Sequence, residues 1–290
     1  MSIIKSFVFN LRESHFNPHT LLHGIHYSAT PTYLRVLKPL VRSGPPWVRK
    51  HIEETYHAKV VTLDDAKKFI TVEEKIDLRN LDQVLPFKHA RDIVLLNPRN
   101  IVAYECACRA QKEHPCEPTD VCLVVGEPFA DLIRLTSPLR SRRISAEEAL
   151  RIMEEERDRG HVQTAWFKTA MLDRFYAICN CCGCCCLGIR FTTEYRTRTL
   201  LPSGYLAVID EGCEGCGRCA KTCPFKAIEL RPVQGDGKRK KRAVIIEEKC
   251  FGCGVCEARC KSGSISLRRE PSKGVPLDIV ALASAAAASS

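Results

Sequence analysis

The sequence contains no hydrophobic run as long as the roughly 20 residues that a membrane-spanning helix needs. The apolar stretch from Ile3 to Leu11 is interrupted by Lys5 and Asn10, and no small-residue cleavage site follows it. These features do not fit a secretory signal peptide. We therefore expect a cytoplasmic protein that does not span a membrane.

Several sequence patterns of enzymes that bind nucleotides or use a catalytic triad are also missing. No glycine-rich dinucleotide fingerprint follows a predicted strand, and there is no P-loop and no defensible Ser–His–Asp arrangement. If nucleotide or flavin chemistry is involved, we expect another chain to supply it.

Cysteine is absent from the first 100 residues and abundant afterwards. The chain has 18 cysteines in 290 residues, ten of them between Cys106 and Cys186 and eight between Cys213 and Cys260. This density is typical of a secreted disulfide scaffold or of a metalloprotein. Without a signal peptide, metal-bound thiolates in a reducing compartment are the better interpretation.

The last eight cysteines form an internal repeat. CEGCGRCAKTCP begins at Cys213 and CFGCGVCEARCK begins at Cys250, and both have the spacing C-x2-C-x2-C-x3-C. In this spacing three thiolates surround one [4Fe–4S] cluster and the fourth binds the other cluster. Zinc ribbons do not repeat a third and fourth cysteine in this way. The predicted ligands are Cys213, Cys216, Cys219 and Cys260 for the first cluster, and Cys250, Cys253, Cys256 and Cys223 for the second.

On these motifs, residues 205–270 resemble bacterial two-[4Fe–4S] ferredoxins. The resemblance implies a βαββαβ fold and one-electron transfer. The sequence departs from the family at Lys261, where a second proline is expected, and in an enlarged loop at residues 231–242.

A second group of cysteines has a less regular pattern. It includes CACRAQKEHPCEPTDVC from Cys106 and CNCCGCCC from Cys179. Neither segment alone has the spacing that surrounds a cluster, so ligands from both are expected. At least one additional iron–sulfur cluster, a zinc ion or redox-active thiols would each explain the segment, and the first is favoured. The predicted ligands are Cys106, Cys108, Cys116, Cys122, Cys179, Cys181, Cys182 and Cys185.

The region around these cysteines is similar to the cysteine-rich region that precedes ferredoxin repeats in a group of ferredoxin-domain proteins of anaerobes. The similar segments are IVAYECACR, VCLVVGEPFA, RRISAEEAL, RGHV and AICNCCGCCC. The resemblance implies iron–sulfur binding without naming a reaction. Arg109 follows Cys108 and could offset the negative charge of a thiolate-bound cluster.

The formal net charge of +10 is concentrated in part in the basic run at residues 238–242. Single-stranded nucleic acid is usually bound by basic residues mixed with aromatic ones, and this run has no aromatic residue. We therefore expect no nucleic-acid partner. Charge runs usually form solvated loops, and this run is consistent with one. The functional interpretation that we prefer is docking to an acidic surface of a redox partner protein.

The predicted class is α+β, with an N-terminal cysteine-rich α/β domain followed by the βαββαβ module. The predicted limits are 1–60 for an extension, 61–195 for the cysteine-rich domain, 205–270 for the ferredoxin domain and 271–290 for a flexible tail or frayed helix. Helices are predicted to begin at Thr62, Pro86 and Ser145, and strands at 101–104 and 121–125. Regular structure is expected to start at Thr62, and residues 192–204 are expected to be a linker.

Two functions are consistent with these features. The first is an electron carrier or redox subunit that relays electrons from the ferredoxin module through the cysteine-rich domain. The second is an oxidoreductase with a catalytic cluster or reactive thiols in residues 106–186. The sequence favours the carrier and leaves the enzyme open.

Overall fold

The computed structural model describes residues 42–233 and 241–288. Most of the predicted N-terminal extension (residues 1–41) and residues 238–240 of the basic run lie outside these ranges. Among the described residues, no helix is both long and apolar enough to cross a membrane.

A seven-stranded sheet organises the first part of the chain. Its strand order is β6-β4-β5-β8-β7-β1-β9, and every pairing is antiparallel except the parallel pair β1–β9. The strands are β1 (Tyr56–Val60), β4 (Ile101–Tyr104), β5 (Cys122–Val125), β6 (Ser141–Ile144), β7 (Val162–Lys168), β8 (Arg174–Cys181) and β9 (Leu200–Leu201).

Helices cover both faces of this sheet, and its strands are buried on both sides except for Arg142 and Arg143 of the edge strand β6, which are exposed. Apolar residues of α5 (Leu63–Thr71) and α8 (Ala146–Asp158) pack on one face. Residues of α7 (Phe129–Thr136) and α9 (Leu187–Tyr195) pack on the other. The remaining elements are α4 (Pro46–Thr55), α6 (Ala107–Ala110), the hairpin of β2 (Ile76–Leu78) with β3 (Ile93–Leu95), and a short 3-10 turn (Thr169–Met171).

The second part of the chain has two antiparallel strand pairs and two short helices. In chain order the elements are β10 (Tyr205–Ile209), α10 (Arg218–Thr222), β11 (Ile228–Pro232), β12 (Lys241–Ile245), α11 (Val255–Ala258) and β13 (Ile265–Arg269). β10 pairs with β13, and β11 pairs with β12. Two 3-10 turns (Glu247–Lys249 and Pro271–Lys273) and α12 (Ile279–Ala288) complete the described chain. The mixture of helices and mainly antiparallel sheets agrees with the α+β class.

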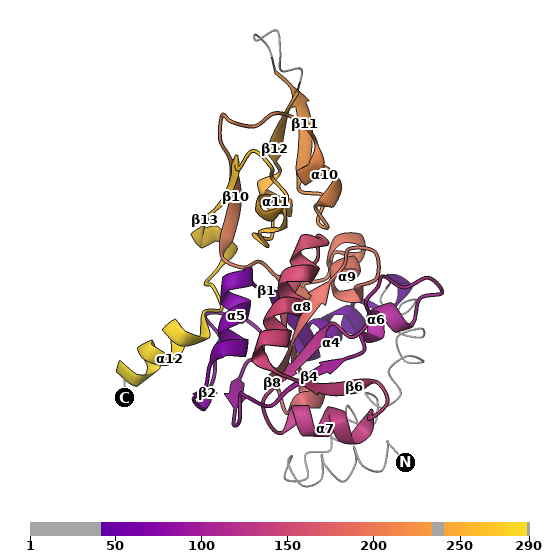
Figure 1. Cartoon of the computed structure of the whole chain (residues 1–290), viewed down its shortest axis with the longest axis vertical. Helices are drawn as coiled ribbons and strands as arrows, with labels where there is room; N and C mark the ends of the chain where they lie inside the picture. Colours follow the sequence, from indigo (N-terminus) through magenta and orange to yellow (C-terminus); the bar gives the residue numbers. More distant parts are fainter. Residues whose placement is uncertain (1–41, 234–240, 289–290) are drawn as a thin grey trace.

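The two parts touch where α10 and α11 face the C-terminal end of α8 (Figure 1). The Arg259 guanidinium donates to the carbonyl of Asp158 at 2.6 Å. A Cβ built on Gly160 would lie 3.9 Å from side-chain carbons of both Thr222 and Val255. The end of α8 and the turn that follows it therefore lie beside both short helices.

Several predicted elements are confirmed. Thr62 and Ser145 are N-caps whose side chains accept from the backbone N–H of Asp65 and Glu148. The strand at 101–104 is present, and the strand predicted at 121–125 begins one residue later.

Three local predictions are wrong. Regular structure begins before Thr62: Ile52 of α4 packs on Leu187 and Phe191, and β1 lies inside the sheet. No helix begins at Pro86. The consecutive buried residues of β3 pair as a strand with β2, and Ala90 has a positive φ of 54° that interrupts a helix. The expected linker at 192–204 contains the end of α9 and all of β9, which pairs with β1. The predicted domain limits stay predictions.

Candidate metal centres

Four cysteines from the two repeat halves line one cavity of the second part. They are Cys223 from the first half and Cys250, Cys253 and Cys256 from the second. Burial raises the pKa of Cys256 to about 12, and the nearby thiols of Cys250 and Cys223 act in the same direction. An apolar cavity with four convergent thiols fits the donor set of a [4Fe–4S] cluster, which takes one thiolate at each iron.

The predicted ligands of the first cluster are only partly brought together in the structure. Cys219 lies close enough to Cys213 and Cys216 for their charges to raise its pKa, although burial is the larger cause. Cys216 is exposed and Cys213 is buried. The Cys260 thiol lies 3.4 Å from the hydroxyl of Ser262. Cys219 also influences Cys256, so the two predicted sets are neighbours.

Two glycines let the cysteine loops pass close to strands. Gly215 and Gly252 have φ values of +69° and +62°, a region that favours glycine. A Cβ on Gly215 would lie 2.0 Å from the carbonyl oxygen of Lys241. A Cβ on Gly252 would lie 2.2 Å from that of Tyr205. Equivalent positions in the two halves thus pack against the starts of β12 and β10.

The ten cysteines of the first part separate into two groups, and each group draws on both predicted segments. The larger, which we call the six-thiol group, is buried or half-buried. Thiol contacts join Cys122 to Cys179 (3.4 Å), Cys106 to both Cys108 and Cys122, and Cys186 to both Cys108 and Cys181. The six-thiol group is Cys106, Cys108, Cys122, Cys179, Cys181 and Cys186.

Strand geometry explains this group. β5 pairs with β8 so that Cys122 lies directly opposite Cys179. Side chains alternate between the faces of a strand, so Cys181 points to the same face as Cys179 and Asn180 points to the other. Cys106 and Cys186 reach this face as the residues immediately before α6 and α9.

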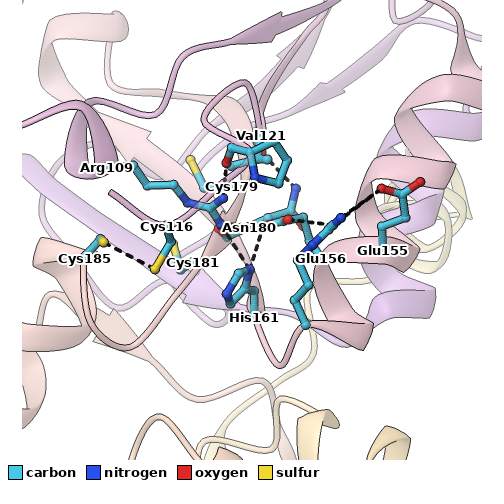
Figure 2. Close-up of polar contacts among 12 residues, drawn as sticks. Arg109, Cys116, Val121, Glu155, Glu156, His161, Cys179, Asn180, Cys181 and Cys185 are labelled. Atoms are coloured by element: carbon cyan, nitrogen blue, oxygen red, sulfur yellow. Dashed lines mark hydrogen bonds and ion pairs between the residues drawn. The ribbon is translucent and has the colours of Figure 1, made fainter. Parts of the chain in front are cut away.

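The smaller group, which we call the four-thiol group, consists of Cys116, Cys182, Cys184 and Cys185. All four sulfur atoms lie within 4.8 Å of one another. The Cys116 sulfur lies 2.9 Å from that of Cys184 and 3.7 Å from that of Cys185. Figure 2 shows Cys116 and Cys185 in contact, near Arg109.

The structure therefore divides the eight cysteines predicted as ligands between two groups. Cys106, Cys108, Cys122, Cys179 and Cys181 lie in the six-thiol group, and Cys116, Cys182 and Cys185 lie in the four-thiol group. Cys184 and Cys186 were not predicted, although each group includes one of them. The turn from Cys182 to Cys186 is closed by a 3.1 Å backbone hydrogen bond. It directs Cys182, Cys184 and Cys185 to the four-thiol group and Cys186 to the six-thiol group. The spacing of the cysteines in the sequence does not predict this turn.

Arg109 connects the segments that carry these cysteines. Its fully buried guanidinium donates to the carbonyl oxygens of Pro118 and Asn180 and to the carboxylate of Glu156 (Figure 2). Burial opposes ionisation of Glu156, but hydrogen bonds from His161 and Arg109 keep its pKa below the ordinary value. Arg109 is thus paired with Glu156. It also lies close enough to Cys182 and Cys106 for their charges to raise its pKa, although the Glu156 contacts are the larger favourable cause. His161 packs in this network, at 2.7 Å from Glu156.

A second cation, Lys168, lies beside the six-thiol group. Its ammonium is 4.7 Å from the ring centres of both Tyr56 and Tyr176. Burial lowers the pKa of Lys168 to about 8, while the nearby thiols of Cys179, Cys108 and Cys122 act in the opposite direction. The six-thiol group therefore has a positive side chain within electrostatic reach of its thiolates.

Comparison with known families bears on the second part of the chain. Residues 212–264 match the family model of the 4Fe-4S dicluster domain. No curated protein matches the chain. The match and the cysteine pattern define an iron–sulfur, ferredoxin-like module in this part and support a role in electron transfer or redox chemistry.

Proposed function

We propose that this protein is an iron–sulfur electron carrier or redox subunit that relays electrons between its two parts. The module, with the βαββαβ ferredoxin fold as its proposed topology, holds two [4Fe–4S] clusters on the predicted ligands. The six-thiol group holds a further iron–sulfur centre. Such clusters supply reversible one-electron transfer when bound.

The observation that supports a relay is the contact between Gly183 and Pro224. A Cβ on Gly183 would lie only 3.2 Å from the Cβ of Pro224. Gly183 belongs to the cysteine-rich turn, and Pro224 follows Cys223, which lines the cavity of the second predicted cluster. The two cysteine systems therefore approach each other through directly packed residues.

The test uses the full chain purified without oxygen. Two clusters in the module require about eight irons per chain, and a [4Fe–4S] centre in the six-thiol group brings the number to about twelve. Cys122→Ser should lower the iron content per chain and remove one redox-active signal in a potentiometric EPR titration. Cys219→Ala should remove a different signal. Iron near four per chain would reject the two-cluster assignment.

A second function has its own support. A [4Fe–4S] cluster takes four cysteines, so a group of six leaves two thiols for other chemistry. Contacts from Cys106 and Cys186 hold the pKa of Cys108 well below its ordinary value, and the thiolate is the reactive form of cysteine. An oxidoreductase that reduces a disulfide or small acceptor is therefore the alternative. Acceptor reduction that is lost in Cys108→Ser but retained in Cys260→Ser would favour it.

The proposed partner is a redox protein with an acidic surface that docks on residues 238–242, in a cytoplasm such as that of an anaerobe. Of the described residues in this run, Arg242 donates to the carbonyls of Ile209 and Asp210 at 3.1 and 2.8 Å. Lys241 is exposed at the start of β12. Neutralising Lys238–Lys241 while keeping Arg242 should slow electron exchange mainly at low salt, because salt screens exposed charges. Rates unchanged at every salt concentration would remove this docking site.

A further inference from the structure

The four-thiol group has the dimensions of a site for a single ion. Three of its sulfur–sulfur distances are 2.9, 3.7 and 3.7 Å, between Cys116 and Cys184, Cys184 and Cys185, and Cys116 and Cys185. Cys182 completes a set in which all sulfurs lie within 4.8 Å of one another. Four donors this close surround one point in space.

These distances match tetrahedral zinc better than a cluster. Zinc binds thiolate at about 2.3 Å, so the four sulfurs of a regular tetrahedral site are about 3.8 Å apart. In a [4Fe–4S] cluster each thiolate binds a different iron. The width of the cluster then separates the sulfurs further than sulfurs that share one ion. The four-thiol group encloses too little space for the second arrangement.

The turn that carries this group keeps it apart from the six-thiol group. The N–H of Cys186 donates to the carbonyl of Cys182 at 3.1 Å, which closes the turn before α9. Cys186 contacts Cys108 and Cys181 on the buried side. Cys184 is exposed and contacts Cys116, 68 residues earlier in the chain.

The segment that supplies Cys116 is held near its C-terminal end, where the Thr119 carbonyl accepts from the Cys106 N–H at 2.7 Å and the Pro118 carbonyl accepts from Arg109. Residues 111–120 form turns and bends without a helix or strand, and none of them is classed as fully buried. A bond from Cys116 through an ion to the 182–185 turn would tie this segment to the sheet and hold Gly183 against Pro224. Four protein ligands leave no open coordination position, which is the arrangement of structural rather than catalytic zinc sites.

We propose that Cys116, Cys182, Cys184 and Cys185 bind one structural zinc ion, separate from the iron–sulfur centres. Binding releases the protons of those thiols that are protonated beforehand, because zinc binds thiolate. The ion fixes the turn through which the cysteine-rich part contacts the ferredoxin module.

The test measures zinc and iron separately in the full chain, purified without oxygen from medium that contains both metals. We expect about one zinc per chain in addition to the iron. Cys116→Ser/Cys184→Ser should lose the zinc and keep the iron. The matched control, Cys122→Ser/Cys179→Ser, comes from the six-thiol group and should keep the zinc. The iron content tests the proposed electron relay, and the zinc content tests the four-thiol site. Either proposal can therefore fail while the other is supported.

A second measurement does not depend on the folding of a variant. Zinc-edge X-ray absorption of the wild-type chain should show four sulfur neighbours at about 2.3 Å. The proposal is overturned by a wild-type chain without zinc, by zinc bound to nitrogen or oxygen, or by zinc that survives in Cys116→Ser/Cys184→Ser. It is also overturned if that variant loses iron instead of zinc.

Discussion

The two cysteine-bearing parts of this molecule gather their thiols by different means. In the ferredoxin-like module, short loops place the cysteines, and glycines such as Gly215 and Gly252 let those loops pass close to strands. In the first part, strand register places Cys122 opposite Cys179, and a buried arginine holds the surrounding segments. Local spacing therefore specifies one part, whereas tertiary contacts specify the other, and mutations should damage them differently.

The largest expected effect comes from Arg109→Met. This change breaks a fully buried ion pair and removes donors to Pro118 and Asn180. Loss of one partner of a buried pair costs about 3–5 kcal/mol of stability. Hydrogen exchange of β5 and β8 amides should measure the loss, while the iron of the module is retained.

The control for that variant is Arg151→Gln. Arg151 lies 3.7 Å from Glu148 with two thirds of its side chain exposed (66%). Exposed pairs contribute at most about 1 kcal/mol, so exchange should hardly change. If Arg109→Met behaved like this control, Arg109 would not organise the first part.

An intermediate effect is expected from Gly252→Ala, which tests the module. The added Cβ would meet the Tyr205 carbonyl at 2.2 Å and the Ser203 hydroxyl at 2.5 Å. Strain of this kind typically costs about 1–3 kcal/mol. We expect iron and the EPR signal of the second cluster to decrease, with the first part unaffected.

Gly263→Ala separates crowding from backbone strain in that experiment. Gly263 also has a positive φ, +67°, but nothing lies within 4 Å of its built Cβ. Only the cost of the left-handed backbone, about 1 kcal/mol, should remain. Equal losses in the two variants would show that close packing of the loop on β10 is unimportant.

The smallest expected effect comes from Gly183→Ala, at the contact between the parts. Its Cβ would lie 3.2 Å from that of Pro224, so the turn must move by a few tenths of an ångström. We expect stability to change by less than about 1 kcal/mol and electron exchange between the parts to slow. Flash reduction followed by absorption at two wavelengths would measure the rate. An unchanged rate would argue against this contact as the route.

The same contrast explains which features the sequence predicted. Ser145 and Glu148 lie within one helical turn, so the N-cap of α8 can be predicted from neighbouring residues in the sequence. The iron–sulfur module was recognisable because its repeat places the cysteines at fixed intervals. The division of the remaining cysteines was not readable, because the contact of Cys116 with Cys184 depends on tertiary structure over 68 residues. β1 was missed because His57 and Lys59 look solvent-exposed in sequence, although both are buried in the sheet.

The junction between the parts has a consequence for timing. β9 pairs with β1, the Lys59 ammonium donates to the Pro202 carbonyl at 2.9 Å, and the Ser203 N–H donates to the Phe251 carbonyl at 3.0 Å. A carrier domain on a flexible linker must diffuse between donor and acceptor, and viscous solvents slow such large domain motions. Here the residues that join the two parts are hydrogen-bonded to both the first part and the ferredoxin-like module. Electron exchange inside the chain should therefore proceed at the same rate in buffer and in viscous glycerol or sucrose solutions.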